Sequence, residues 1–157
     1  MQNVATMKYT YDMISDAYYD GRTICIFRLS DVILCKAEIE NNLNGPAAAL
    51  PYLNQIRARA GAPEYGKHNR FPAPSTKEAM NDAILKERGY ELVFEFQRRA
   101  DLIRFGKYEE VVNAHLKKLG IAQPTNVTSS LRYFPYPLND AQLNPNLAAE
   151  NPSRLPK

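Results

Sequence analysis

Acidic and basic side chains alternate along residues 84–107 at spacings that could serve either catalysis or buried ion pairing. If the segment is helical, Arg88, Glu91 and Glu95 fall within about 60° of one another around the helix axis. Apolar side chains flank this stripe, with Leu92 on one side and Phe94 on the other. A solvated helix has one apolar stripe and one polar face, so this pattern predicts a ladder of ion pairs buried between packed helices. The alternative is a solvated run of charges that apolar residues happen to bracket.

Two carboxylates one helical turn apart are also the pair that a glycoside hydrolase uses. The carboxyl groups of Glu91 and Glu95 would lie within range of the separation found in retaining enzymes. Hydrolysis needs an open cleft and one carboxyl that keeps its proton, whereas Arg88 would lie close enough to keep both groups ionised. The sequence therefore predicts no catalytic residue and no enzyme activity.

Metal and cofactor sites are not predicted either. His68 and His115 lie far apart in the sequence and have no Glu or Cys at ligand spacing, so each is expected to be a loop or surface histidine. The sequence contains no Gly-rich phosphate loop and no nucleophile elbow. We expect neither a bound metal nor a cofactor.

The partners of the charged stripe are expected on neighbouring helices. Asp31 and Glu38 share one side of a helix expected over residues 28–42, and Arg57 lies on the apolar face of the next helix. Removing one member of a buried pair costs about 3–5 kcal/mol, because its partner is left desolvated. The ladder is therefore expected to decide which helix meets which. The predicted network comprises Asp31, Glu38, Arg57, Arg88, Glu91, Glu95, Arg98 and Asp101.

Turn signals divide the first half of the chain into two helices. The helix over residues 28–42 ends before Asn44 and Gly45, and Pro46 suits the first turn of a second helix that stops at Gly61. The apolar face of the second helix carries Leu50, Leu53, Ile56 and Ala60. The two helices predict an αα-hairpin of the size of a tetratricopeptide repeat, although the strict repeat signature is absent.

A loop and a longer central helix are expected next. Residues 62–75 are rich in Pro, and Ser75 with Glu78 forms a capping box that opens the central helix. This helix is expected to run to about Phe96. Shorter helices are expected over residues 98–104 and 107–119.

The two ends of the chain have irregular patterns. Residues 1–22 are expected to wrap over the core as an irregular lead-in, followed by a short extended stretch over residues 23–27. Beyond Gln123, frequent Pro and Asn predict an extended tail with short turns. The aromatic residues expected to hold this tail down are Tyr133, Phe134 and Tyr136.

These elements imply an all-α fold with a TPR-like αα-hairpin, a central helix, further short helices and an extended tail. At 157 residues the chain is long enough for one domain with a real core. We expect a single domain over residues 1–157, with the helical core over 23–119 and the tail over 120–157.

Charge and hydropathy give no sign of nucleic-acid binding or of a membrane-spanning helix. The formal net charge is +3 with acids and bases interspersed, so no electrostatic footprint for nucleic acid is visible. No apolar run approaches the roughly 20 residues of a membrane helix. The first ten residues lack the features of a signal peptide and a lipidation cysteine, so export signals are expected upstream of this sequence.

The two cysteines, Cys25 and Cys35, bracket the start of the first helix. If both were helical they would stand about 15 Å apart, which is too far for a disulfide. Their neighbours are apolar, so the sequence predicts buried free thiols.

Exposed aromatic rings are the candidates for contacting a small ligand, because aromatic side chains with a few polar groups line most small-ligand sites. Tyr18 and Tyr19, beside Asp16 and Asp20, form the best cluster, and Tyr65 in the Pro-rich loop is second. The alternative is ordinary packing of amphipathic rings.

Residues 87–107 follow the pattern E-R-x-x-E-L-x-F-E-x-x-R-x-x-D-L-x-R-x-G-K, which resembles the C-terminal part of the SusD/RagB family. Three further blocks resemble the family in the same order. Residues 28–38 are similar to R-x-x-[DE]-V-x-L-x-x-A-E, and residues 53–61 to L-N-x-[IV]-R-x-R-A-G. Residues 135–152 are similar to the closing P-I-P…N-P-x-L-x-Q-N-P tail. The family often has aromatic residues where this chain has Arg99 and Ala100.

The resemblance implies a partial SusD-like fold from the C-terminal portion of an outer-membrane, lipid-anchored nutrient-binding protein of the Bacteroidetes. Its implied partners are a SusC-like TonB-dependent transporter, a glycan or peptide ligand and the N-terminal part of the same protein. In such proteins the glycan site is drawn largely from regions N-terminal to this portion, so no family binding residue maps onto this chain. A helical-repeat scaffold that binds only protein remains the alternative, because the αα-hairpin suits it equally well.

Overall fold

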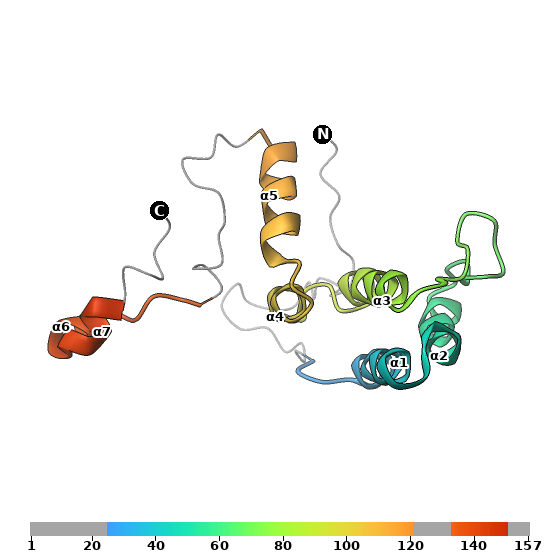
Figure 1. Cartoon of the computed structure of the whole chain (residues 1–157), viewed down its shortest axis with the longest axis horizontal. Helices are drawn as coiled ribbons and strands as arrows, with labels where there is room; N and C mark the ends of the chain where they lie inside the picture. The colour runs from blue at the N-terminus through green and yellow to red at the C-terminus, as the bar shows by residue number, and fades with distance from the viewer. Residues whose placement is uncertain (1–24, 121–132, 151–157) are drawn as a thin grey trace, which may run out of the picture.

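The computed structural model describes residues 25–120 and 133–150, and its core is a three-helix layer (Figure 1). Helices α1 (Leu29–Asn44) and α2 (Pro46–Arg59) pack against each other as an αα-hairpin, and α3 (Lys77–Glu91) packs against both. Within the described ranges no strand is formed, and His68 and Phe71 make an isolated bridge. The all-α fold and the hairpin predicted from the sequence are confirmed.

A single residue, Gly45, connects the two helices of the hairpin. Its φ of 88° lies in the left-handed region, where a side chain would be strained, so glycine suits this position. Pro46 follows as the first residue of α2, where its missing N–H leaves no helical hydrogen bond unmade. The Gly-Pro pair therefore reverses the chain within one residue, and α1 and α2 lie side by side.

The core is filled by side chains from the facing sides of α1, α2 and α3. Small side chains between larger ones allow the three helices to approach closely. The buried set comprises Leu34, Ala37, Ala49, Leu53, Ile56, Met80, Ala83 and Ile84. Asn41 is the polar member of this layer and is fully buried; its amide nitrogen donates to the carbonyl of Lys77 at 2.8 Å and to Asn81 Oδ1 at 2.7 Å. These bonds tie the end of α1 to the beginning of α3.

The loop between α2 and α3 is pinned back onto α2. The side chain of Asn54 donates to the carbonyl of Tyr65 at 3.0 Å and accepts from the backbone N–H of Tyr65 at 2.9 Å. The rings of Tyr65 and Phe71 meet edge to face with centroids 5.8 Å apart. The loop predicted over residues 62–75 is therefore present, and it presents two rings beside the end of α2.

The central helix is shorter than predicted at both ends. Thr76 caps it instead of Ser75, because the Thr76 hydroxyl accepts the N–H of Ala79 at 3.1 Å. The helix ends at Glu91, not near Phe96, and residues 92–96 form turns in which Phe94 and Phe96 both have a φ of 61°. A helix cannot continue through left-handed residues, so the expectation that Glu95 lies on this helix is wrong.

Two helices follow the turns and agree with the sequence to within a residue or so. Helix α4 (Arg98–Arg104) packs against α3, and α5 (Tyr108–Lys118) packs against α4 and points away from the three-helix layer (Figure 1). Gly106 between them has a φ of 68°, which allows the change of direction.

The extended tail that Pro and Asn predicted is instead partly helical. Helices α6 (Leu138–Leu143) and α7 (Pro145–Glu150) pack on each other, apart from the helical core (Figure 1). Pro145 occupies the first residue of α7, where proline is compatible with a helix. The guanidinium carbon of Arg99 lies 4.2 Å from the centroid of the Phe134 ring, and Phe134 is largely exposed. The Tyr136 hydroxyl donates a hydrogen bond to Glu150 Oε2 at 3.2 Å.

The structure also places the two cysteines and the residues just before α1. Cys25 and Cys35 are free as predicted, but both residues are exposed instead of buried, and the Cys35 thiol lies 3.6 Å from Arg88 Nη1. Of the extended stretch expected over residues 23–27, the structure describes residues 25–27, and Ile26 and Phe27 form a bend. The whole of the lead-in predicted over residues 1–22, with Tyr18 and Tyr19, lies outside the described residues. Among the described helices, none has the length and hydropathy needed to cross a membrane.

Two leucines on α1 allow a matched test of this packing. Leu34 is fully buried and Leu43 is 74% exposed. We expect Leu34→Ala to lower the free energy of unfolding by about 2–5 kcal/mol, because it leaves a cavity in the core. Leu43→Ala, the control, should change it by less than about 0.5 kcal/mol. Urea unfolding followed by circular dichroism measures both, and equal effects would contradict the described core.

Candidate functional site

Arg88 lies at the centre of a seam of ion pairs where α1, α3 and α4 meet. Its side chain is 3% exposed; Nη2 pairs with Asp31 of α1 at 2.8 Å and Nε pairs with Asp101 of α4 at 2.8 Å. Burial disfavours the charge, but the hydrogen bonds that Arg88 donates to Asp101 and Asp31, with the charges of these acids, outweigh it and raise the pKa of Arg88 above its usual value. One guanidinium therefore connects three helices while it stays charged.

Arg28, just before α1, holds both carboxylates that the sequence suggested as a catalytic pair. Its Nε donates to both oxygens of Glu95 at 2.9 Å, and Nη1 donates to Glu91 Oε1 at 2.5 Å. It also bonds Ser30 and the carbonyl of Glu91. Arg59 of α2 pairs with the same Glu91 oxygen at 2.5 Å. These contacts join the start of α1 to the end of α3 and to the turn that follows it.

Arg57 forms a second buried pair, between α2 and α3. Its Nη1 lies 2.6 Å from Glu87 Oε2, with both side chains 5% exposed, and its Nε donates to the carbonyl of Pro63 at 2.7 Å. The guanidinium carbon lies 4.6 Å from the ring centroids of both Tyr65 and Phe71. The charge is therefore paired, hydrogen-bonded and stacked, so it can remain buried.

Arg104 and Arg98 of α4 complete the seam in different ways. Arg104 pairs with Glu38 of α1 and, at 3.1 Å, with Asp101. Arg98 is predicted as an ion-pair member but donates instead to the carbonyl of Leu85 at 2.7 Å, and no carboxylate pairs with it in the described part of the chain. Its guanidinium lies against Gly89, where an added Cβ would come within 2.9 Å of Nη1. Glycine thus leaves room for Arg98 to bind the α3 backbone.

The structure changes which arginine serves which acid. Placing residues 84–107 on one helix predicted that Arg88 lies beside Glu91 and Glu95 and keeps both ionised. This prediction is wrong, because the Arg88 side chain pairs with Asp31 and Asp101. Arg28 and Arg59 take that role. The sequence reasoning missed Arg28 because it counted this residue as the first of the helix expected over residues 28–42, whereas α1 begins at Leu29 and the Arg28 side chain reaches the end of α3. Its position at the head of the residue 28–38 motif was the available signal.

The pairing removes the proton that acid catalysis would need. Burial alone would raise the pKa of Glu91, but hydrogen bonds from Arg28 and Arg59 outweigh it and hold the pKa below its usual value. Glu95 is buried and held by two bonds from Arg28. His68 and His115 are exposed, and the residues that the structure describes contain no cluster suited to a metal ion.

A cleft of about 470 Å³ lies beside the Arg57 pair and contains the one described candidate for ligand binding. Tyr65 and Phe71 line it from the loop, and both rings are half-buried. Tyr90, at the end of α3, lines it as well and is 61% exposed, and the sequence analysis did not single it out. Tyr65 therefore does lie in a partly aromatic cleft, although its ring also packs on Arg57.

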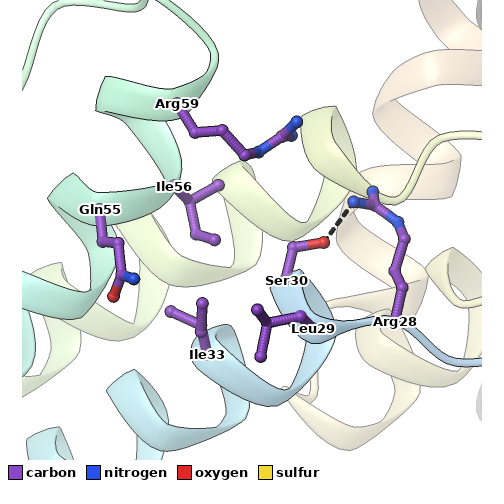
Figure 2. A pocket seen from close by; sticks show the side chains of 7 residues that line it. All are labelled: Arg28, Leu29, Ser30, Ile33, Gln55, Ile56 and Arg59. Atoms are coloured by element: carbon purple, nitrogen blue, oxygen red, sulfur yellow. Dashed lines mark hydrogen bonds between the residues drawn. The ribbon is translucent and has the colours of Figure 1, made fainter.

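A second cleft, of about 350 Å³, lies between the start of α1 and the second half of α2 (Figure 2). Leu29, Ile33 and Ile56 form its apolar lining, and Arg28 and Arg59 lie at one edge. Both arginines are held by Glu91, so this edge of the cleft is part of the ion-pair seam.

Comparison with known proteins places the chain in a family. A model of the SusD family matches residues 2–153. The chain belongs to the SusD family. Several of the ion-paired side chains described above, from Arg28 and Asp31 to Asp101 and Arg104, lie in the sequence blocks that resemble the family.

The curated SusD family relatives are much longer than this chain. SusD-like protein P25 of Formosa agariphila is 39% identical over 120 residues, covering 76% of this chain and 22% of that protein. Starch-binding protein SusD of Bacteroides thetaiotaomicron is 28% identical over 137 residues, covering 86% of this chain and 22% of that protein. The chain therefore spans about a fifth of the length of these relatives. No solved structure matches it significantly.

Arg57 and Arg59, two residues apart on α2, test the value of the buried pair. Arg57→Met leaves Glu87 charged and buried, and we expect it to lower the free energy of unfolding by about 3–5 kcal/mol. Arg59→Met removes a side chain that is 61% exposed and should cost less than about 1 kcal/mol. Glu95→Gln should also lower the melting temperature, because it weakens the pairing with Arg28. Unchanged melting temperatures for both Arg57→Met and Glu95→Gln would refute a structural role for the network.

The Glu91 pairing also predicts a dependence of stability on pH. Because the folded-state pKa of Glu91 is depressed below the usual value of 4.5, its stabilising effect is complete above that pH and is lost as the pH falls through the folded-state pKa. In Glu91→Gln the free energy of unfolding should therefore fall less steeply as the pH is lowered. The control Glu110→Gln, which replaces a side chain that is 71% exposed, should leave this pH dependence unchanged. Urea titrations from about pH 3 to pH 7 measure this slope. If the free energy of unfolding of Glu91→Gln depends on acid pH as that of the unsubstituted protein does, the pairing does not depress the pKa of Glu91.

Proposed function

We propose that the full-length protein containing this chain is a non-catalytic subunit that binds nutrient glycans and delivers them to a TonB-dependent transporter of the SusC type. The observation that carries the proposal is membership of the SusD family, with a starch-binding relative that aligns over 86% of this chain. We further propose that the protein is lipid-anchored at the outer-membrane surface, through a signal outside this chain. Peptides are the second ligand class that such a subunit could take.

The non-catalytic assignment is supported by the state of the acidic residues. Glu91 and Glu95 are both held by Arg28, and the pKa of Glu91 is lowered, so neither acts as a poised acid. Asp31 and Asp101 are occupied by Arg88 in the same way. The charges of this region serve to hold helices together, which is what a binding scaffold requires.

Three tyrosines are the proposed sugar-stacking residues within this chain. Tyr18 and Tyr19 keep that role as a sequence-based proposal. The cleft supports this role for Tyr65, because Tyr90 adds an exposed ring there and Lys86 adds a charged group at the rim. Aromatic rings with a few polar groups are the usual composition of a small-ligand site.

One observation favours a second function, that of a helical scaffold that binds only protein. The αα-hairpin leaves several large apolar side chains of α1 exposed, as a protein-docking surface would. Carbohydrate affinity distinguishes the two proposals, because a scaffold of this kind has none.

Titration of the full-length protein with starch oligosaccharides, and with a panel of other polysaccharides, tests the proposal. We expect binding of at least one glycan. If the site includes this chain, Tyr18→Ala with Tyr19→Ala, or Tyr90→Ala, should weaken binding about tenfold, because a ring stacked on the ligand is lost. Tyr133→Ala, an exposed ring outside both candidate sites, is the control. A folded protein that binds a partner protein but no glycan or peptide would favour the scaffold instead.

A further inference from the structure

A shallow hollow between α3 and the start of α4 adjoins the cleft that contains Tyr65. The hollow has a volume of about 290 Å³. Lys86 and Tyr90 line both cavities, so the two are neighbours along the same side of α3. We call this cavity the Arg98 hollow; its lining comprises Asp82, Leu85, Lys86, Gly89, Tyr90 and Arg98.

The guanidinium of Arg98 has unused hydrogen-bond donors in this hollow. Its Nη1 donates to the carbonyl of Leu85 at 2.7 Å, and this is the one hydrogen bond that the side chain makes to the described part of the chain. A guanidinium carries five N–H donors, so most of them remain available. The bond to Leu85 and the close approach to Gly89 hold the group against α3. Arg98 is therefore a positioned cation without an acidic partner among the described residues.

The remaining charges of the Arg98 hollow leave an excess of positive charge. Lys86 is the second cation of the lining; it is exposed, and no acid of the described ranges pairs with it. Asp82 is the one acid among these lining residues, and it lies 3.9 Å from Lys107 Nζ. An anion that enters the hollow would thus meet two cations and one acid that already has a positive neighbour.

The cleft beside Tyr65 differs, because its charges are already paired. Arg57 pairs with Glu87 inside the cleft, and Glu91 pairs with two arginines that do not line it. Lys86 is the other charged residue of that lining, at the border with the Arg98 hollow. The cleft therefore offers a ligand mainly aromatic rings, whereas the hollow beside it offers unpaired cations.

We infer that the two cavities form one site for an acidic oligosaccharide. A sugar ring lies in the cleft against Tyr90, and a carboxylate or sulfate of the neighbouring sugar binds Arg98 and Lys86. The planar guanidinium can donate two parallel N–H bonds to such an oxyanion, and the Lys86 ammonium adds a second charge. The volumes of about 470 and 290 Å³ together fall in the range of small-ligand sites, roughly 300–1,000 Å³. This inference rests on the proposed function and names the class of glycan.

Titration of the full-length protein with matched acidic and neutral oligosaccharides tests the inference. The galacturonic acid trimer is compared with its methyl ester, and a κ-carrageenan oligosaccharide with its desulfated form, so that the two pairs distinguish carboxylate from sulfate. We expect at least one acid to bind at least about tenfold more tightly than its neutral counterpart, because it accepts charge-assisted bonds. The preference should shrink as the NaCl concentration rises.

Three glutamine variants locate the acidic group. Lys86→Gln should weaken binding of the acid about threefold and Arg98→Gln about tenfold, and neither should change binding of the neutral counterpart more than about twofold. The control is Lys118→Gln, which replaces an exposed lysine of α5 outside both cavities. Circular dichroism checks the fold of each variant. Lys86 has no partner in the described ranges, so Lys86→Gln tests the site even if Arg98→Gln disturbs the contact between α4 and α3.

Several outcomes would overturn the inference while the proposed function stands. Equal affinity for each acid and its neutral counterpart would do so, as would binding of the acid that Lys86→Gln and Arg98→Gln leave unchanged. An equal loss in Lys118→Gln would show attraction to the net charge and no defined site. A folded protein that binds no glycan, acidic or neutral, would instead refute the proposed function and this inference with it.

Discussion

The dry contact of Arg88 with Asp31 and Asp101 is the constraint on which the arrangement of helices depends. A guanidinium that is 3% exposed must have its charge and hydrogen bonds satisfied by the protein. The two acids come from α1 and α4, so neither helix can shift along α3 without stranding a buried charge. Such a contact adds little net stability compared with apolar packing, but it excludes alternative packings. Apolar contacts alone would let α1 or α4 slide along α3 at a much smaller cost in free energy.

The turn after α3 depends on the same kind of contact. Phe94 and Phe96 adopt left-handed conformations, which cost of order 1–3 kcal/mol each for residues with a side chain. Burial of Leu92 and the two bonds from Arg28 to Glu95 offset this cost. The strained turn therefore brings Glu95 back to the start of α1, which Glu91 also reaches. As a result, ion pairs join the residue before α1 to the end of α3 and to the turn after it.

The residues that carry the family resemblance are those that hold the helices together. Arg28, Asp31, Arg88, Asp101 and Arg104 are paired across helices. The blocks that resemble the family thus describe a scaffold, and ligand choice would come from other residues. In the proposed function these are rings such as Tyr65 and Tyr90 beside the scaffold, together with parts of the protein outside this chain.

The sequence by itself determined the helices of the hairpin, the loop after it, the short helix α4 and α5, because Gly, Pro and apolar spacing act over a few residues. It also indicated that charges such as Arg88 and Glu95 would be removed from water, since apolar residues flank them. Only the tertiary structure decided the pairing. Periodicity cannot show that a helix stops at Glu91, and once the chain turns there, Glu95 faces Arg28 while Arg88 faces Asp31 and Asp101. The choice of partner depends on where separate helices meet in space, and that is set by the packing of the whole core.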